Sequence, residues 1–207
     1  MTDEISSALP AKPDPKTGEP RPPRAPVLAE YPNRAEPADL MRGPESPVKD
    51  QPLLAWRWTS LAIFARLAAL AVALGVGAGV VLQLADVPRS APANGWLGAF
   101  VGVVVGLILV RPRKLGAGAA WLSYGRRWVR THELTKIEVK PSLLGPVIRL
   151  AGPDNNLLTL MLSDLQTNRD LWDYVHLGIR YSLANGKAKA NARAIEKLGL
   201  RYQDRRA

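Results

Sequence analysis

The hydrophobic positions of the chain form two long uncharged runs in the middle, followed by shorter patterned segments. Residues 67–85 and 91–110 contain no charged side chain, and the short stretch DVPRS at 86–90 separates them. An α-helix of about 20 such residues spans the ~30 Å hydrocarbon core of a bilayer. The pattern therefore predicts a transmembrane helical hairpin over residues 53–114, with spans at about 61–85 and 94–110. A buried helical hairpin of a globular domain is the alternative.

Basic residues flank both runs, whereas the connection between them carries only Arg89 beside Asp86. The positive-inside rule then places both termini in the cytoplasm. The localisation expected from this pattern is a bacterial plasma membrane, crossed more than once. The flanking residues are Arg57, Arg66, Arg111, Arg113 and Lys114.

Glycines recur at four-residue spacing in both runs, which lets two helices approach closely in lipid. We expect these glycines to pack the hairpin or to mediate homo-oligomer contacts, and chance in alanine- and glycine-rich spans is the alternative. An oligomeric pore is a weaker hypothesis on the same observation. The helix-packing candidates are Gly75, Gly79, Gly98, Gly102 and Gly106.

Strand-like patterns follow the second run. Residues 136–140 (KIEVK) alternate apolar and charged side chains, which is typical of a half-buried strand. Apolar segments at 119–125, 127–134, 147–150 and 157–162 are further strand candidates. Turn-forming residues at 151–156 (AGPDNN) separate the last two candidates and predict a hairpin.

The period then changes from two to about 3.6 residues, between 167 and 186. The apolar side chains that fall on one helical face are Leu171, Trp172, Val175, Ile179 and Leu183. Either Thr167 or Asn168 is suited to cap the start of this helix, and Gly186 is suited to end it. Residues 187–200 are rich in alanine and basic side chains, and they predict a further short helix.

Short antiparallel strands followed by one amphipathic helix are the outline of a pleckstrin-homology-like (PH-like) module. The expected fold class is therefore an α+β membrane protein. It consists of the transmembrane hairpin, a small antiparallel PH-like cytoplasmic domain at 115–186, and a basic C-terminal helix or tail at 187–207.

The N-terminal 52 residues differ in composition from the rest of the chain. They hold 12 of the 18 prolines and mix charges of both signs. Such a segment buries too little apolar surface to offset the entropy lost on ordering, so we expect a disordered cytoplasmic tail with polyproline II character. The stretch PRPPRAP at 20–26 is suited to dock in an aromatic groove of a partner; a solvated tether is the alternative.

Charge and cysteine content narrow the functional classes. The net charge is +10, and residues 53–207 hold 21 basic and 9 acidic side chains. This balance favours anionic partners, either nucleic acid or the inner leaflet of a membrane. The chain has no cysteine, which excludes disulfides, thiolate catalysis and cysteine metal sites.

Catalytic and cofactor motifs are not apparent in the sequence. The two histidines, His132 and His176, lack a second ligand at metal-site spacing, and Asp170 with Asp173 fits the start of a helix. Neither a phosphate-binding glycine loop nor a nucleophile elbow is present. The sequence therefore predicts a protein that is not an enzyme and that needs no cofactor.

Two groups of basic residues are the binding candidates. The first would contact phosphates or a membrane surface, and the second would contact nucleic acid. A cytoplasmic stop after a span and a solvated helix face are the alternatives for the two groups. The first group comprises Arg111, Arg113, Lys114, Arg126, Arg127 and Arg130; the second comprises Lys187, Lys189, Arg193 and Lys197.

The chain also resembles a family over about residues 57–200. A THELT strand, a paired L-x-L hairpin and an N-x-x-LWD-x-V-x-x-G-I helix occur here at 131–135, 148–162 and 168–179. With these motifs the chain resembles small membrane proteins of actinobacterial conjugative and integrative elements, which have two transmembrane helices and a PH-like cytoplasmic domain. The resemblance implies a setting beside FtsK-like DNA translocases and plasmid-spread proteins. It assigns no functional residue, because the motif positions are core positions.

The function expected from these observations is a non-enzymatic integral membrane adaptor or scaffold, accessory to conjugative DNA transfer. Its PH-like domain would bind a protein partner, such as an FtsK-like translocase, or the anionic lipid bilayer. Sequence-independent DNA binding is the alternative, beside the oligomeric pore.

Overall fold

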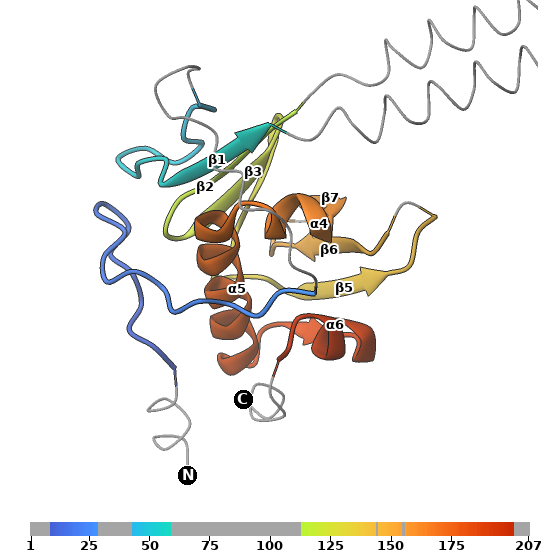
Figure 1. Ribbon diagram of the computed structural model, residues 1–207. Coiled ribbons are helices and arrows are strands. Elements are labelled where there is room, and N and C mark those ends of the chain that lie inside the picture. The colour runs from blue at the N-terminus through green and yellow to red at the C-terminus, as the bar shows by residue number, and fades with distance from the viewer. Residues whose placement is uncertain (1–8, 29–42, 59–112, 144, 155, 201–207) are drawn as a thin grey trace, which may run out of the picture. The chain divides into compact units, whose positions relative to one another are not determined.

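The computed structural model of the protein describes residues 9–28, 43–58, 113–143, 145–154 and 156–200. All of these residues belong to one compact unit, which the chain builds from segments on both sides of residues 60–112. The described unit contains two β-sheets and three helices (Figure 1).

The first sheet has four antiparallel strands in the order β1-β2-β3-β4. They are β1 (Ala55–Trp58), β2 (Lys114–Ala117), β3 (Trp121–Tyr124) and β4 (Arg127–Arg130). Strands β1 and β2 lie on opposite sides of the long uncharged runs, yet Ala55 pairs with Ala117 and Trp58 with Lys114. Gly125 has φ 63° in the tight turn from β3 to β4, a conformation that glycine adopts without steric cost.

The second sheet has the order β7-β6-β5-β8. Strands β5 (Lys136–Lys140), β6 (Val147–Ala151) and β7 (Leu157–Met161) are antiparallel, and the two-residue β8 (Lys189–Ala190) pairs in parallel with β5. The alternation predicted for 136–140 is confirmed, because Ile137 and Val139 are buried while Lys136 and Lys140 are exposed.

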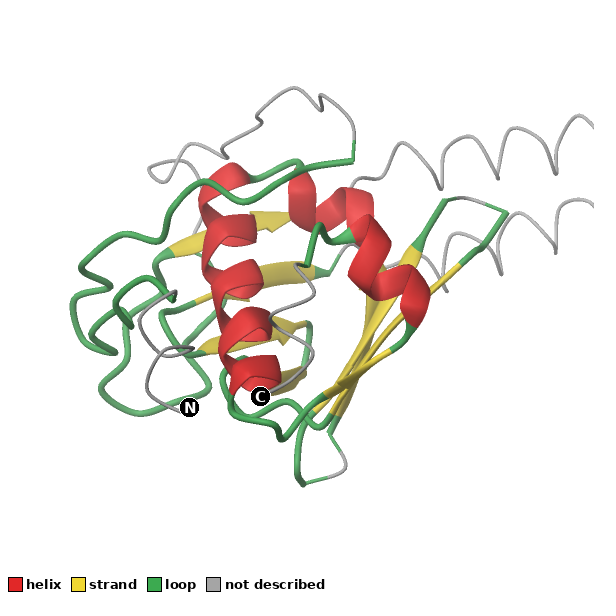
Figure 2. Ribbon diagram, turned by 90° about the horizontal axis from the view of Figure 1, so that it is seen from below, coloured by secondary structure: helices red, strands yellow, loops and turns green. Residues whose placement is uncertain are grey.

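Three helices complete the described unit: α4 (Leu162–Gln166), α5 (Arg169–Ala184) and α6 (Ala192–Lys197). Asn168 caps α5, because its side-chain oxygen accepts a hydrogen bond from the Leu171 N–H at 3.1 Å. This confirms one of the two predicted caps. Helix α5 lies across the sheets (Figure 2), and its buried Leu171, Trp172 and Val175 share one core with residues of both sheets.

The expected fold class is corrected by these elements. No helix among the described residues has the length and apolarity needed to cross a membrane. The same finding contradicts the multi-pass plasma-membrane localisation. In place of a transmembrane hairpin followed by a small antiparallel domain, the described residues form two four-stranded sheets and three helices. Arg57 and Lys114, predicted to flank spans, lie instead in β1 and β2. The predicted spans at 61–85 and 94–110, with Gly75, Gly79, Gly98, Gly102 and Gly106, lie outside the described residues.

The N-terminal region also differs from the expected disordered tail. Residues 9–28 and 43–58 belong to the same unit as the sheets, and Ala25 is part of the hydrophobic core. The composition of this segment describes it in isolation, whereas Ala25 and Pro26 are held by side chains of α5 about 150 positions later in the chain. Residues 1–8 and 29–42 lie outside the described residues.

Gly178 on α5 packs closely on Thr131, the residue that follows β4. A Cβ atom at this position would lie 3.0 Å from the carbonyl carbon of Thr131, and still closer to its side chain. We expect Gly178→Ala to lower the free energy of unfolding by about 2 kcal/mol in chemical denaturation, because overpacking outweighs the helix propensity of alanine.

Gly152→Ala is the matched control for this substitution. An added Cβ at Gly152 meets no atom closer than 3.9 Å. Equal stability of the Gly178→Ala and wild-type chains would show that α5 does not pack this closely on the residue that follows β4.

Candidate functional site

Residues 9–28, called the tail segment from here on, lie beside α5 and form hydrogen bonds and ion pairs with its side chains (Figure 1). Three aromatic side chains of α5 each donate a hydrogen bond to a main-chain carbonyl of the segment. The Trp172 indole N–H donates to the Pro26 oxygen at 2.7 Å, and the Tyr174 hydroxyl donates to the Gly18 oxygen at 3.0 Å.

The third donor is the Tyr181 hydroxyl, which donates to the carbonyl of Pro10 near the other end of α5. The three contacts therefore fix the tail segment at both ends and near its middle. Gln166, which lies just before α5, extends the series, because its side-chain oxygen accepts a hydrogen bond from the Leu28 N–H at 3.2 Å. We call the surface formed by Gln166, Asp170, Trp172, Asp173, Tyr174 and Tyr181 the α5 face.

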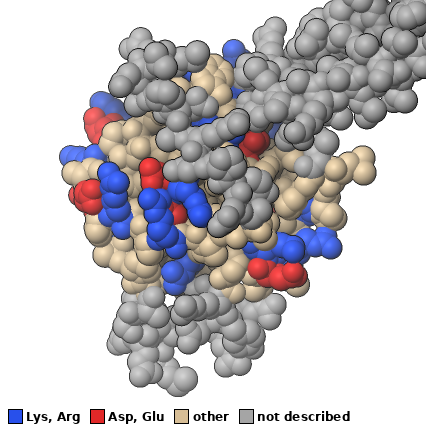
Figure 3. Space-filling model, in the orientation of Figure 1, with Lys and Arg blue, Asp and Glu red and all other residues tan. Residues whose placement is uncertain are grey.

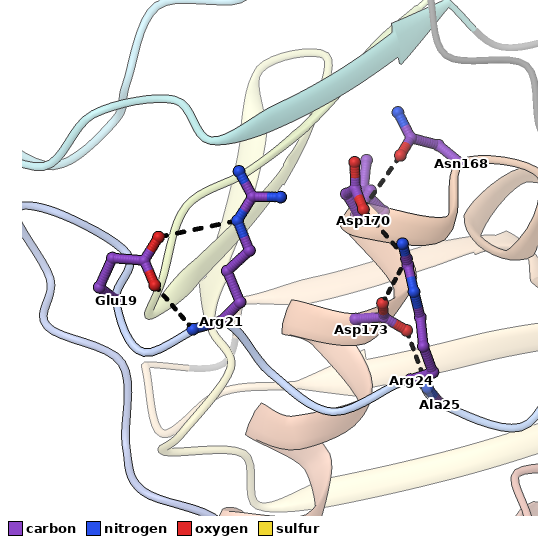
Figure 4. Close-up of polar contacts among 8 residues, drawn as sticks. Glu19, Arg21, Arg24, Ala25, Asn168, Asp170 and Asp173 are labelled. Carbon is purple, nitrogen blue, oxygen red and sulfur yellow. Dashed lines mark hydrogen bonds and ion pairs between the residues drawn. The ribbon is translucent and has the colours of Figure 1, made fainter.

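Asp170 and Asp173, an acidic pair at the start of α5, bind Arg24 of the tail segment. Arg24 Nη1 lies 2.8 Å from Asp173 Oδ2 and 3.0 Å from Asp170 Oδ1 (Figure 4). The other Asp173 oxygen accepts a hydrogen bond from the Ala25 N–H at 2.8 Å. Asp173 is therefore paired by both an arginine and the adjacent main chain.

Burial and pairing shift the pKa of Asp173 in opposite directions. Burial raises the pKa of its carboxyl, and the Ala25 N–H and Arg24 guanidinium lower that pKa by a smaller amount. The same hydrogen bond with Asp173 raises the pKa of Arg24. We assign the ionised carboxylate to Asp173, because both of its oxygens accept hydrogen bonds, one of them from a cation.

A cleft of about 210 Å³ lies between the tail segment and α5. Its wall is formed by the turn at Thr17–Glu19, by the side chain of Leu54, and by Asp170 and Tyr174 of the helix. Arg21 also lines the cleft, but its Nε lies 3.7 Å from Glu19 Oε1, so this ion pair is internal to the tail segment (Figure 4).

The described members of the first predicted group lie in or beside strands β2 to β4 of the first sheet, where the Gly125 N–H donates to the Lys114 carbonyl at 2.9 Å. Arg113 lies over the Tyr124 ring at 5.5 Å, and Lys114 lies over the Trp58 ring at 5.2 Å. Arg126 and Arg127 are exposed at the turn from β3 to β4. Arg130 at the end of β4 pairs with Glu133 at 3.2 Å. Arg111 lies outside the described residues.

The second predicted group lies around β8 and α6. Lys187, Lys189, Arg193 and Lys197 are all exposed. Lys189 is the register partner of Lys136 on β5, and Lys197 pairs with Glu196 at 3.3 Å. On the visible part of the face in Figure 3, basic side chains are interspersed with acidic ones and form no continuous patch.

The histidines have structural roles in the described unit. His176 packs beside Trp172, and its Nε2–H donates to the Leu198 carbonyl at 2.9 Å. His132 packs edge-on against the Tyr181 ring. Burial is the main cause that lowers the pKa of each imidazole to about 4. Among the described residues, no group of three His, Cys, Asp or Glu side chains is arranged to hold a metal ion.

The α5 face was not among the predicted sites. A signal was present, because residues 170, 173, 174, 177 and 181 follow helical spacing and include two tyrosines and two aspartates. From its sequence, the stretch PRPPRAP at 20–26 is suited to dock in an aromatic groove of a partner. In the structure its contacts come from the same chain, because Pro26 accepts a hydrogen bond from Trp172 while Arg24 and Ala25 contact Asp173.

Comparisons with known proteins give no family assignment. No protein-family model, no curated protein and no solved structure matches the chain. The resemblance to proteins of conjugative elements therefore stays a prediction, and the α5 face has to be interpreted from its own chemistry.

Proposed function

We propose that the protein is a non-enzymatic adaptor whose α5 face binds an extended, proline-rich segment that contains an arginine. The observation that supports this proposal is the set of contacts between the α5 face and the tail segment, which has that composition. A partner protein would present a segment of the same chemistry to the same face.

The donors of the α5 face suit a proline-rich ligand for a physical reason. Proline has a carbonyl acceptor but no main-chain N–H, so a proline-rich segment presents more acceptors than donors. Tryptophan and tyrosine supply N–H and O–H donors on rigid apolar rings, and aromatic-lined grooves bind polyproline segments in this way. Trp172, Tyr174 and Tyr181 meet this requirement on one helix.

The acidic pair adds selectivity to these contacts. Asp173 has a side chain that is only 5% exposed, and it accepts hydrogen bonds from both Arg24 and the Ala25 N–H. A carboxylate held in this environment favours a cation at one position of the ligand. The expected recognition element is therefore an arginine followed by a residue that retains its main-chain N–H.

The partner class rests on the resemblance described above. In a conjugative setting, an FtsK-like DNA translocase or another transfer protein would carry the proline-rich segment. The adaptor would then connect this translocase or transfer protein to another protein of the transfer system. Its own contribution would be binding rather than catalysis.

A peptide series on the full-length Arg24→Glu chain tests the proposed function, because this substitution weakens the hold of the chain's own tail segment. We expect a labelled peptide of residues 9–28 to bind in fluorescence anisotropy. A peptide with Arg24→Ala should bind about tenfold more weakly, since it cannot form the charge-assisted bonds to Asp170 and Asp173.

The control peptide carries Arg21→Ala, because Arg21 pairs within the tail segment and not with α5. Its affinity is expected to match that of the unmodified peptide. Absence of binding for every peptide, or equal affinity for the Arg24→Ala and Arg21→Ala peptides, would count against the proposed recognition.

Sequence-independent DNA binding is the second candidate function. The observation that favours it is the juxtaposition of Lys136 and Lys189 as register partners on β5 and β8, with Lys187 close by in sequence. Two like charges directly opposite each other destabilise a sheet, and a bound DNA phosphate would reduce this repulsion. Glu138, 2.8 Å from Lys136, supplies part of this compensation within the protein.

Mobility shifts of duplex DNA by the full chain test this second function. The full chain is used because a fragment that starts at residue 115, where the cytoplasmic domain was predicted to begin, would lack β1 (Ala55–Trp58) of the first sheet. If DNA binds around β8, replacing Lys187, Lys189, Arg193 and Lys197 with alanine should lower the salt slope by up to about 3.6, because each phosphate that a basic side chain neutralises contributes about 0.9. An unchanged slope would exclude this surface.

A further inference from the structure

We infer that the tail segment is an intramolecular mask, which occupies the α5 face until a proline-rich segment of a partner displaces it. The inference rests on the proposed function, because it assigns a regulatory role to the segment that occupies the same site. It concerns how the site is controlled rather than which ligand chemistry the site accepts.

The tail segment uses the donors that a partner would need. The indole N–H of Trp172 and the hydroxyls of Tyr174 and Tyr181 are all engaged by tail carbonyls, and both Asp173 oxygens are engaged by Arg24 and Ala25. A second proline-rich ligand cannot form these bonds while the tail segment forms them. Binding of the two segments is therefore mutually exclusive.

The tail segment binds the α5 face weakly, because little of the segment is buried. Within residues 9–28 only Pro13, Gly18 and Ala25 are buried, and the Arg24 side chain is 68% exposed. Few apolar side chains anchor it to the core, so its attachment depends on directional polar bonds. Such an interface is weak between separate molecules.

Covalent linkage compensates for this weakness. Residues 29–42 connect the tail segment to residues 43–58, which belong to the same compact unit as the α5 face. Linking two binding elements within one chain turns their association into an intramolecular step, with effective concentrations up to the millimolar range. A contact that is weak between molecules is then well occupied within one, yet a multivalent or better-matched partner can displace it.

Charge reversal of the tail distinguishes a mask from a passive contact. Arg24→Glu in the full chain places a carboxylate beside Asp170 and Asp173, so the tail segment should leave the α5 face. Arg21→Glu makes the same change of charge three residues away, where the described partner is Glu19 of the tail itself. The two variants have equal net charge, and of the two arginines Arg24 is the one that pairs with the α5 carboxylates.

The probe is the labelled peptide of residues 9–28, titrated into the wild-type, Arg24→Glu and Arg21→Glu chains. If the tail segment masks the face, the Arg24→Glu chain should bind the probe at least about tenfold more tightly than the wild-type chain, and Arg21→Glu should resemble wild type. Asp173→Ala in the Arg24→Glu background should remove the gain, which assigns the binding to the α5 face.

The outcomes separate the mask from the proposed function. Measurable and equal affinity of all three chains would overturn the mask and leave the peptide-binding function intact. Failure of all three chains to bind the probe at millimolar concentration would overturn the proposed function together with the mask. Circular dichroism and thermal melting of each variant identify any loss of folding, and a variant that fails this check is replaced by Arg24→Gln.

Discussion

Trp172→Ala is expected to lower the free energy of unfolding by about 4 kcal/mol. This value is typical of the truncation of large buried aromatic side chains. Trp172 is fully buried, and it belongs to the core shared by α5 and both sheets. The substitution also removes the indole donor to the Pro26 carbonyl. Chemical denaturation followed by circular dichroism measures the change.

Two variants separate the core role of Trp172 from its role in binding the tail segment. Trp172→Phe keeps most of the apolar volume but loses the N–H, so it should cost about 2 kcal/mol and loosen the tail segment near Pro26. Trp128→Ala, at a half-buried position on β4, should cost less than either. A decrease of less than about 1 kcal/mol for Trp172→Ala would contradict the packing of α5 on the sheets.

Acid is expected to destabilise the protein between about pH 6.5 and pH 4. His132 and His176 have pKa values lowered to about 4 by burial, whereas an unfolded chain has a histidine pKa near 6.5. In this window the unfolded chain binds more protons than the folded chain, so stability falls as pH falls. Above about pH 6.5 stability no longer depends on these histidines. Below about pH 4 each histidine has lowered the free energy of unfolding by about 3 kcal/mol.

His132→Phe isolates this contribution. Neither ring nitrogen of His132 has a hydrogen-bond partner among the described residues, and phenylalanine can preserve the edge-on contact with Tyr181. The variant should match or exceed wild-type stability at pH 7.5 and lose less stability at pH 5. Asp164 and Asp173 have raised pKa values and act with opposite sign, so the difference between variant and wild type is the quantity to compare.

Local patterns predicted the elements whose partners are close in sequence. The strands at 136–140 and 157–161 and the helix at 169–184 were recognisable from periodicity, because one face of each is buried against the core. Strand β1 was missed because its partner β2 follows it by 56 residues and neither strand alternates clearly. Strand β8 has only two residues and depends on β5 for its pairing.

The candidate site was missed for a related reason. The composition of residues 1–52 indicates little capacity to form a core of their own, but it carries no information about distant hydrogen-bond donors. The acceptors at Gly18 and Pro26 find their donors at Tyr174 and Trp172, more than 140 positions away. Periodicity selected Trp172 as a core residue, and its N–H had no assigned role.

Amide hydrogen exchange at Ala25 tests the central claim most directly, because this N–H donates to Asp173 only when the tail segment lies on the α5 face. In the wild-type chain we expect Ala25 to exchange on the order of 100-fold more slowly than in the isolated peptide of residues 9–28. In the Asp173→Ala chain the rate should approach that of the peptide. Exchange at the peptide rate in the wild-type chain would contradict the docking of the tail segment.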